Sequence, residues 1–173
     1  MCGIVGYVGY DNATPMLLHG LEKLEYRGYD SAGIAVYCAD KIQVYKEKGR
    51  LANLEEIIRD KGIKSNIGIG HTRWATHGKP SNINAHPHMS EDGKFAIVHN
   101  GIIENYISLK EELLNKGVKF SSETDSEVVA QLLSDVYTGD FLDAVVQVLD
   151  KIEGSYALAI MCSDYPDQII AVR

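Results

Sequence analysis

Cysteine is scarce in this 173-residue sequence, and its three cysteines lie far apart. No two of these cysteines, which are Cys2, Cys38 and Cys162, form a CxxC pair. The sequence therefore offers neither a disulfide framework nor a cysteine-rich zinc site. Separated cysteines in odd number are typical of a reducing compartment, and we therefore expect a cytoplasmic protein.

Long apolar runs and an excess of positive charge are also missing. No run approaches the ~18 residues of a transmembrane helix, and the N-terminus lacks the basic and apolar regions of a secretory signal peptide. The net charge of −7 disfavours attraction to phosphate-rich surfaces. We therefore expect neither a nucleic-acid partner nor a membrane partner.

The composition is that of a globular domain, with 45% hydrophobic and 24% charged residues. No repeat or linker divides the chain, so residues 1–173 are expected to form one domain. Helices and strands occur in mixed order, which predicts an α+β layered sandwich with helices packed outside sheets. Strands are expected at 3–9, 34–37, 42–45, 67–70, 95–99, 156–161 and 169–172, and helices from 15, 51, 105, 124 and 141.

Several details of these elements are specific enough to test. Met16 is expected on the buried face of the first helix, and Ile57 on that of the second. Thr124 with Glu127 three residues later predicts a capping box. The last two strands read as nearly continuous apolar runs, so both are expected to be covered on both faces.

The sequence begins Met1-Cys2-Gly3. Removal of Met1 would leave Cys2 with a thiol and a free α-amine, whose pKa of about 7.7–8.0 suits a general base. One residue would then act as both nucleophile and base, as N-terminal threonine does in other enzymes. The alternative is a small apolar residue in a buried first strand.

A segment rich in polar residues, 71–78, follows the strand at 67–70 and is expected to be irregular. Arg73 presents a rigid guanidinium fork that suits a carboxylate. Thr76 and His77 add neutral hydrogen-bonding groups, and Trp74 can wall a pocket. The alternative is an arginine paired with an internal carboxylate and a tryptophan in the core.

Histidines are concentrated in the middle of the chain, and they raise the question of a metal site. Their spacing matches no standard zinc pattern, and acidic and cysteine ligands are missing nearby. We therefore expect no metal, and loop-ordering histidines that bond to the backbone. The histidines concerned are His71, His77, His86, His88 and His99.

Two further motifs carry polar groups. Asn100-Gly101 follows an apolar strand and can supply an amide and a backbone N–H to an oxyanion, although Asn-Gly is also a strong turn dipeptide. Asp125 lies at the expected start of a helix, where it can favour the helix dipole or hold a substrate ammonium group. The sequence leaves both pairs of alternatives open.

Together these motifs resemble the glutaminase domains of glutamine–fructose-6-phosphate aminotransferases (glucosamine-6-phosphate synthases). These domains belong to the glutamine amidotransferases with an N-terminal cysteine nucleophile. The resemblance covers essentially the whole chain and rests on six segments: 2–6, 24–33, 71–78, 84–88, 99–105 and 122–125. It implies the four-layer αββα sandwich of N-terminal nucleophile hydrolases, without a cofactor. In that family the domain continues beyond residue 173.

The resemblance implies a catalytic set. Cys2 would attack the side-chain amide of L-glutamine and form a γ-glutamyl thioester. Asn100 and Gly101 would hold the oxyanion, while Arg27 and His86 would support the surroundings of Cys2.

The resemblance also implies a substrate-binding set. Arg73, Thr76 and His77 would hold the substrate carboxylate, Asp125 would hold the ammonium group, and Trp74 would lie in a closing loop. Ammonia would pass to an isomerase domain that acts on fructose 6-phosphate, in an enzyme expected to be a homodimer.

Three other functions remain open at the level of sequence. The chain resembles, more distantly, the amidotransferases of purine and asparagine synthesis, but Tyr26, Tyr29 and Trp74 point to the hexosamine branch. A non-catalytic glutamine-binding module would usually have lost Cys2, Arg73 or Asp125. A metal-dependent hydrolase would require the ligand set that the histidines do not provide.

Overall fold

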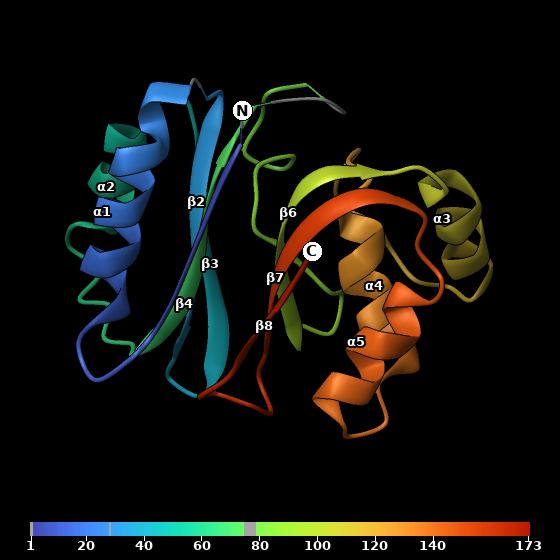
Figure 1. Ribbon diagram of the computed structural model, residues 1–173. Helices are drawn as coiled ribbons and strands as arrows, with labels where there is room; N and C mark the ends of the chain where they lie inside the picture. Colours follow the sequence, from blue (N-terminus) through green and yellow to red (C-terminus); the bar gives the residue numbers. More distant parts are fainter. Residues whose placement is uncertain (1, 28, 75–78) are drawn as a thin grey trace.

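The computed structural model describes residues 2–27, 29–74 and 79–173, and it consists of four layers (Figure 1). Two antiparallel sheets of four strands face each other. The first has the order β1-β4-β2-β3, built from Gly3–Val8, Ile67–Arg73, Ser31–Cys38 and Lys41–Lys48. The second has the order β5-β6-β7-β8, built from His88–Met89, Phe95–Ile103, Gly154–Cys162 and Ile169–Val172.

Helices cover the outer face of each sheet (Figure 1). Helix α1 (Ala13–Leu24), a short 3₁₀ turn (Glu25–Arg27) and α2 (Leu51–Ile58) belong to the first sheet. Helices α3 (Tyr106–Asn115), α4 (Glu127–Val136) and α5 (Phe141–Leu149) belong to the second. This arrangement confirms the predicted α+β sandwich of αββα type. No helix in the described part of the chain has the length and apolarity that a bilayer crossing requires.

Three apolar layers hold the sandwich together. Leu17 and Leu21 pack with Leu54 under the first sheet, while Phe95 and Phe141 belong to the larger core beneath α4 and α5. The third layer lies between the sheets and includes the following buried side chains: Ile67, Ile69, Ala96, Val98 and Met161. Each fully buried Leu, Ile or Phe stabilises the fold by about 1.5–3 kcal/mol.

The small residues of β4 have a packing function. A Cβ at Gly68 would lie 2.7 Å from Leu17 Cδ1, and one at Gly70 would lie 3.1 Å from Leu21 Cδ1. The glycines therefore leave room for the α1 helix, whose leucines lie close against this face of β4. Ile67 and Ile69, at the alternate positions, fill the core between the sheets.

Five strands are longer than predicted, and two of these extensions, in β4 and β6, affect the functional residues. Strand β4 continues through His71 to Arg73, where it pairs with β2 and β1. Strand β6 continues through Asn100 and Gly101 to Ile103 and pairs with β7 along nine positions. Asn100-Gly101 is therefore neither a strand end nor a turn.

Other details of the prediction are wrong. Met16 and Ile57 are 43% and 37% exposed and point away from the core. Thr124 does not cap α4; Ser126 occupies the N-cap position without a side-chain cap bond. Strand β8 is only partly buried, because it is the last strand of its sheet.

Candidate active site

Cys2 lies where the first strand begins, beside the end of β4. Gly3 pairs with Thr72 in the antiparallel register, which brings Cys2 next to Trp74. The Trp74 backbone N–H donates to Cys2 Sγ at 3.1 Å, and Sγ lies 3.4 Å from the Trp74 carbonyl oxygen. The half-buried sulfur borders a cavity of about 240 Å³. This volume suits a ligand smaller than the drug-sized molecules that occupy about 300–1,000 Å³.

Asn100 and Gly101 reach the same place from the facing sheet. Asn100 Nδ2 donates to the Cys2 carbonyl oxygen at 3.3 Å, and Asn100 Oδ1 lies 2.8 Å from His71 Nε2. Gly101, which lines the cavity, has φ +124°. The amide of Asn100 is thus adjacent to the residue that carries the thiol, as an oxyanion donor must be.

Arg73 and Asp125 border this cavity as well, and both are almost fully buried. Arg73 Nη1 lies 3.6 Å from Asp30 Oδ1, so the alternative of an internal ion pair is realised together with a position at the cavity. Asp125 precedes α4, and its Oδ2 accepts the Ile103 backbone N–H at 2.9 Å. A cation and an anion therefore stand at one small cavity, which is the charge pattern that a free amino acid requires.

Four buried imidazoles, from His71, His86, His88 and His99, form a histidine cluster, and all but His88 line the cavity. The His71 and His86 rings stack with centroids 4.3 Å apart, and His86 meets His88 edge-on at 4.5 Å. The His99 backbone N–H donates to His86 Nδ1 at 3.3 Å. The cluster thus packs as one unit between the sheets.

Burial lowers the pKa of every member of the histidine cluster. The pKa of His71 falls to about 4, and those of His86 and His88 fall well below 6.5. Burial also lowers the pKa of His99, although the carboxylate of Asp125 opposes this shift. All four rings are therefore neutral at pH 7, and each carries one ring N–H.

The cluster also supports the segment that carries Asp125. His99 Nδ1 lies 2.7 Å from Ser126 Oγ, and His88 Nε2 lies 3.0 Å from Thr124 Oγ1. These bonds hold the residues on both sides of Asp125. Within residues 2–27, 29–74 and 79–173, no group of three or more His, Cys, Asp or Glu side chains is arranged to hold a metal ion.

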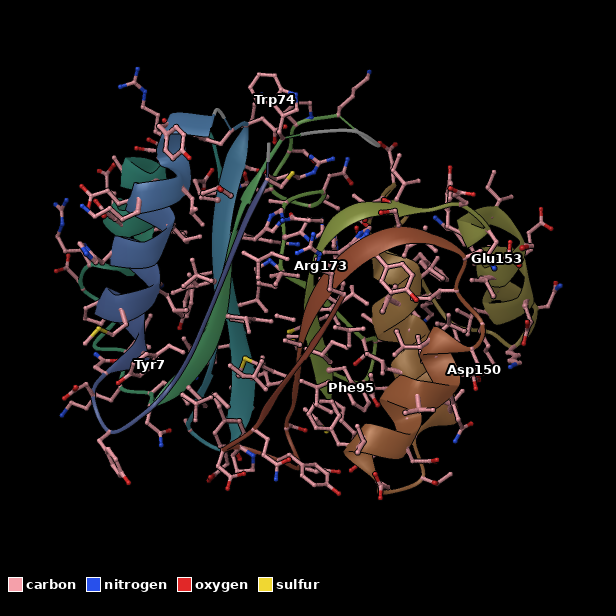
Figure 2. All side chains as sticks on the ribbon, viewed as in Figure 1. Tyr7, Trp74, Phe95, Asp150, Glu153 and Arg173 are labelled. Atoms are coloured by element: carbon pink, nitrogen blue, oxygen red, sulfur yellow. The ribbon has the colours of Figure 1, made fainter. Side chains whose placement is uncertain are left out.

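The remaining predicted site residues differ in position. Trp74 is 55% exposed and lies at the mouth of the site, where Figure 2 shows its side chain at the edge of the two sheets. His86 lies in the histidine cluster. Thr76 and His77 lie outside the described residues, and so does the side chain of Arg27, whose backbone closes the 3₁₀ turn.

Two residues near the site were given no role from the sequence, although Asp30 lies in the segment 24–33 that carries the family resemblance. Asp30 pairs with Arg73, and its backbone N–H donates to the Arg73 carbonyl oxygen at 2.7 Å. Lys46 is a half-buried lysine on β3 whose Nζ donates to the carbonyl oxygens of Ala85 at 2.8 Å and Pro87 at 3.3 Å. Burial lowers the pKa of Lys46 to about 8. A lysine in an alternating strand normally reads as a solvent-facing side chain.

Comparison with known proteins agrees with this geometry. Residues 71–173 match a family described as a glutamine amidotransferase domain. The glutamine–fructose-6-phosphate aminotransferase (isomerizing) of Caldanaerobacter subterraneus is 58% identical over the whole chain, and that of Aquifex aeolicus is 55% identical. The chain spans only 28% and 29% of these two relatives.

Solved structures give the same answer for the fold. The glutamine phosphoribosylpyrophosphate amidotransferase from B. subtilis, solved with ADP and GMP, superposes with a TM-score of 0.80 at 28% identity. The match covers 94% of this chain and 35% of that one. The N-terminal nucleophile fold and the resemblance seen in the sequence are thereby confirmed, and this chain belongs to the family of glutamine amidotransferase domains.

Proposed function

We propose that this chain hydrolyses the side-chain amide of L-glutamine to glutamate and ammonia. One observation carries the proposal: Cys2, Gly101, Arg73 and Asp125 border one cavity of about 240 Å³. A nucleophile, a hydrogen-bond donor site, a cation and an anion are what hydrolysis of a free amino acid's side-chain amide requires.

The reaction begins when Met1 has been removed and the α-amine of Cys2 is free. The amine accepts the thiol proton, and the thiolate attacks the substrate amide carbon. Asn100 and Gly101 donate hydrogen bonds to the oxyanion that forms. The amine then returns the proton to the leaving nitrogen, so ammonia departs and a γ-glutamyl thioester remains. Water, deprotonated by the same amine, releases glutamate and restores the thiol.

Substrate binding uses the charged groups at the cavity. Arg73 holds the α-carboxylate, and Asp125 holds the α-ammonium group. Thr76 and His77 are assigned to the carboxylate end by the family resemblance, and Trp74 to a loop that closes the site. Arg27 and His86 support the surroundings of Cys2, His86 through its stacking on His71.

For the complete protein we propose the activity named for its relatives, because identity to them reaches 58% across the chain. Ammonia would pass to an isomerase domain and convert fructose 6-phosphate to glucosamine 6-phosphate in a homodimer. A cytoplasmic location is part of the proposal, since the described cysteines are all unpaired.

Replacement of the nucleophile tests the proposal. Cys2→Ala in the complete protein should lower glutamate release from glutamine by at least ~10³-fold, because the thioester cannot form. Cys38→Ala is the matched control, since Cys38 lies at the end of β2 and outside the cavity, and it should retain full activity. Unchanged release by the Cys2 variant would contradict the mechanism.

Covalent labelling separates an enzyme from a non-catalytic glutamine-binding module. The electrophilic glutamine analogue 6-diazo-5-oxo-norleucine should add once to the complete protein, at Cys2, as measured by intact mass and peptide mapping. A protein that binds glutamine but takes up no label would support the binding module.

A further inference from the structure

We propose that His71 is a positioning residue that fixes the orientation of the Asn100 side-chain amide and so aims one of its N–H groups at the oxyanion. The proposal rests on the proposed function, because it takes Asn100 as an oxyanion donor. His71 lies on β4 and Asn100 lies on β6, so the contact joins the two sheets. His71 Nε2 is 2.8 Å from Asn100 Oδ1.

The surroundings of Asn100 favour one of the two possible amide orientations. The Cys2 carbonyl oxygen only accepts hydrogen bonds, so the amide atom that faces it at 3.3 Å must be Nδ2. Oδ1 then faces His71. One hydrogen of Nδ2 bonds to the Cys2 carbonyl oxygen, and the other is the donor for the oxyanion.

The orientation of the amide requires one tautomer of His71. Because the ring is neutral at pH 7, it carries a single N–H, and Oδ1 of Asn100 can only accept. The hydrogen must therefore be on Nε2. The other tautomer would place a lone pair against Oδ1 or favour a turned amide, and a turned amide presents oxygen to the carbonyl of Cys2 and to the oxyanion. Tautomer and amide orientation therefore change together.

The ring of His71 is held in place on its flat face. The His86 ring stacks on it at 4.3 Å with an interplanar angle of 26°. His86 is fixed in turn, since its Nδ1 accepts the His99 backbone N–H. Lys46 Nζ holds the carbonyl oxygens of the residues on both sides of His86. The orientation of Asn100 thus depends on packing in the first sheet, although Asn100 belongs to the second.

Two variants in the complete protein separate the donor from the bulk of the side chain. His71→Leu replaces the imidazole with an apolar side chain of similar size and so removes the N–H. It should lower kcat for glutamine hydrolysis by about 10–100-fold, somewhat less than the 10²–10³-fold loss of a whole oxyanion donor. KM should stay within about 3-fold, because Arg73 and Asp125 bind the substrate. His71→Gln, whose amide nitrogen reaches the place of Nε2, should recover most of kcat.

A double-mutant cycle with Asn100→Ala gives the decisive comparison. If His71 acts through Asn100, adding His71→Leu to the Asn100→Ala variant should lower kcat by less than about a further 2-fold. His88→Leu is the matched control, since His88 bonds to Thr124, and any loss that it causes should multiply with that of Asn100→Ala. Multiplying losses for His71 and Asn100 would overturn the proposal.

The outcomes distinguish this proposal from the proposed function. An impaired Asn100→Ala with an unimpaired His71→Leu would overturn the role of His71 alone. Full activity of Asn100→Ala would remove the oxyanion role of Asn100 and the role of His71 with it. If His71→Leu does not fold, His71→Asn serves as the variant without the donor, because the shorter amide of asparagine cannot reach Oδ1 of Asn100. Equal kcat values for His71→Asn and His71→Gln would also overturn the proposal.

Discussion

At Gly101 the backbone conformation and the neighbouring strand both exclude a side chain. Its φ of +124° is unfavourable for any residue with a Cβ. A Cβ there would lie 2.0 Å from the backbone oxygen of Ser155 on β7. Gly101, the oxyanion donor that we propose next to Asn100, therefore combines a special conformation with close strand packing.

Gly101→Ala should lower the free energy of unfolding by more than ~2 kcal/mol and remove glutaminase activity, because strain and the clash with Ser155 act together. Urea unfolding followed by circular dichroism measures the first effect. Gly117→Ala is the control: Gly117 also has positive φ, +89°, but a Cβ there meets nothing within 4 Å. It should cost only ~1 kcal/mol and leave activity intact. Equal losses for the two variants would contradict this account.

At the scale of single residues, much of the site was predictable. Cys2, Arg73, Asn100 and Asp125 each stood in a short polar motif, and motifs of this kind mark functional residues on loops and element ends. The pairing of Asp30 with Arg73 was not predictable, because the two residues are 43 positions apart and only the strand register brings them together.

At the scale of elements, the segment before α4 is held by side chains rather than by a helix cap. The Glu127 carboxylate accepts the backbone N–H groups of Ser121 at 2.8 Å and Ser122 at 2.6 Å. Thr124 Oγ1 bonds to Ser122 Oγ and to His88 Nε2, both at 3.0 Å. The capping-box prediction was wrong because tertiary partners took the groups that a local cap would use.

Thr124→Val should destabilise the protein by about 1–3 kcal/mol, because it leaves a buried nitrogen of His88 without its partner. It should also raise KM for glutamine, since Asp125 is the next residue. Thr14→Val is the matched control. Thr14 is buried on α1, and its hydroxyl has no hydrogen-bond partner among the described residues, so the change should leave the free energy of unfolding unchanged or raise it. A normal KM for Thr124→Val would separate Thr124 from substrate binding.

Strand β6 shows why some element ends could not be predicted. Local chemistry at Asn100-Gly101 favours a turn. The nine-residue pairing with β7 outweighs that preference and keeps the strand extended to Ile103. The hairpin at 31–48 was predictable, by contrast, because both of its strands and its turn lie close together in the sequence.

At the scale of the whole molecule, four neutral imidazoles lie buried between the sheets, and this makes stability depend on pH. Burial holds the pKa of His71 at about 4 in the folded state, against 6.5 when the chain is unfolded. As pH falls from 6.5 toward 4, the unfolded chain therefore binds protons that the folded chain does not. His86, His88 and His99 shift in the same direction.

The free energy of unfolding should therefore be highest above pH 6.5 and should fall below it, by about 1.4 kcal/mol per pH unit for His71 alone. Urea unfolding at pH 7.5, 6.5 and 5.5 measures this slope. His71→Gln should make it shallower, because it removes one of the buried imidazoles. A free energy that stays constant between pH 6.5 and 5.5 would contradict the expected cost of charging the cluster.

The overall architecture was predictable because hydrophobic periodicity and element order depend on local sequence. The way in which the two sheets pack against each other was not predictable from local sequence, because it depends on long-range contacts such as that between His71 and Asn100. Met16 and Ile57 were predicted to be buried but are exposed. The burial of a side chain at the margin of a helix face also depends on long-range contacts.

If the proposed mechanism holds, the seam between the sheets also decides when the chain becomes reactive. Cys2, His71 and Arg73 come from one layer, while Asn100, Gly101 and Asp125 come from the other or from the segment leading to its helices. A nascent or partly folded molecule already carries the thiol, but it has neither Asn100 nor Gly101, the proposed oxyanion donors, beside it until the layers dock. Under the proposed mechanism, glutamine would then be consumed only by molecules that have finished assembling, so the chemistry itself would report on the completeness of folding.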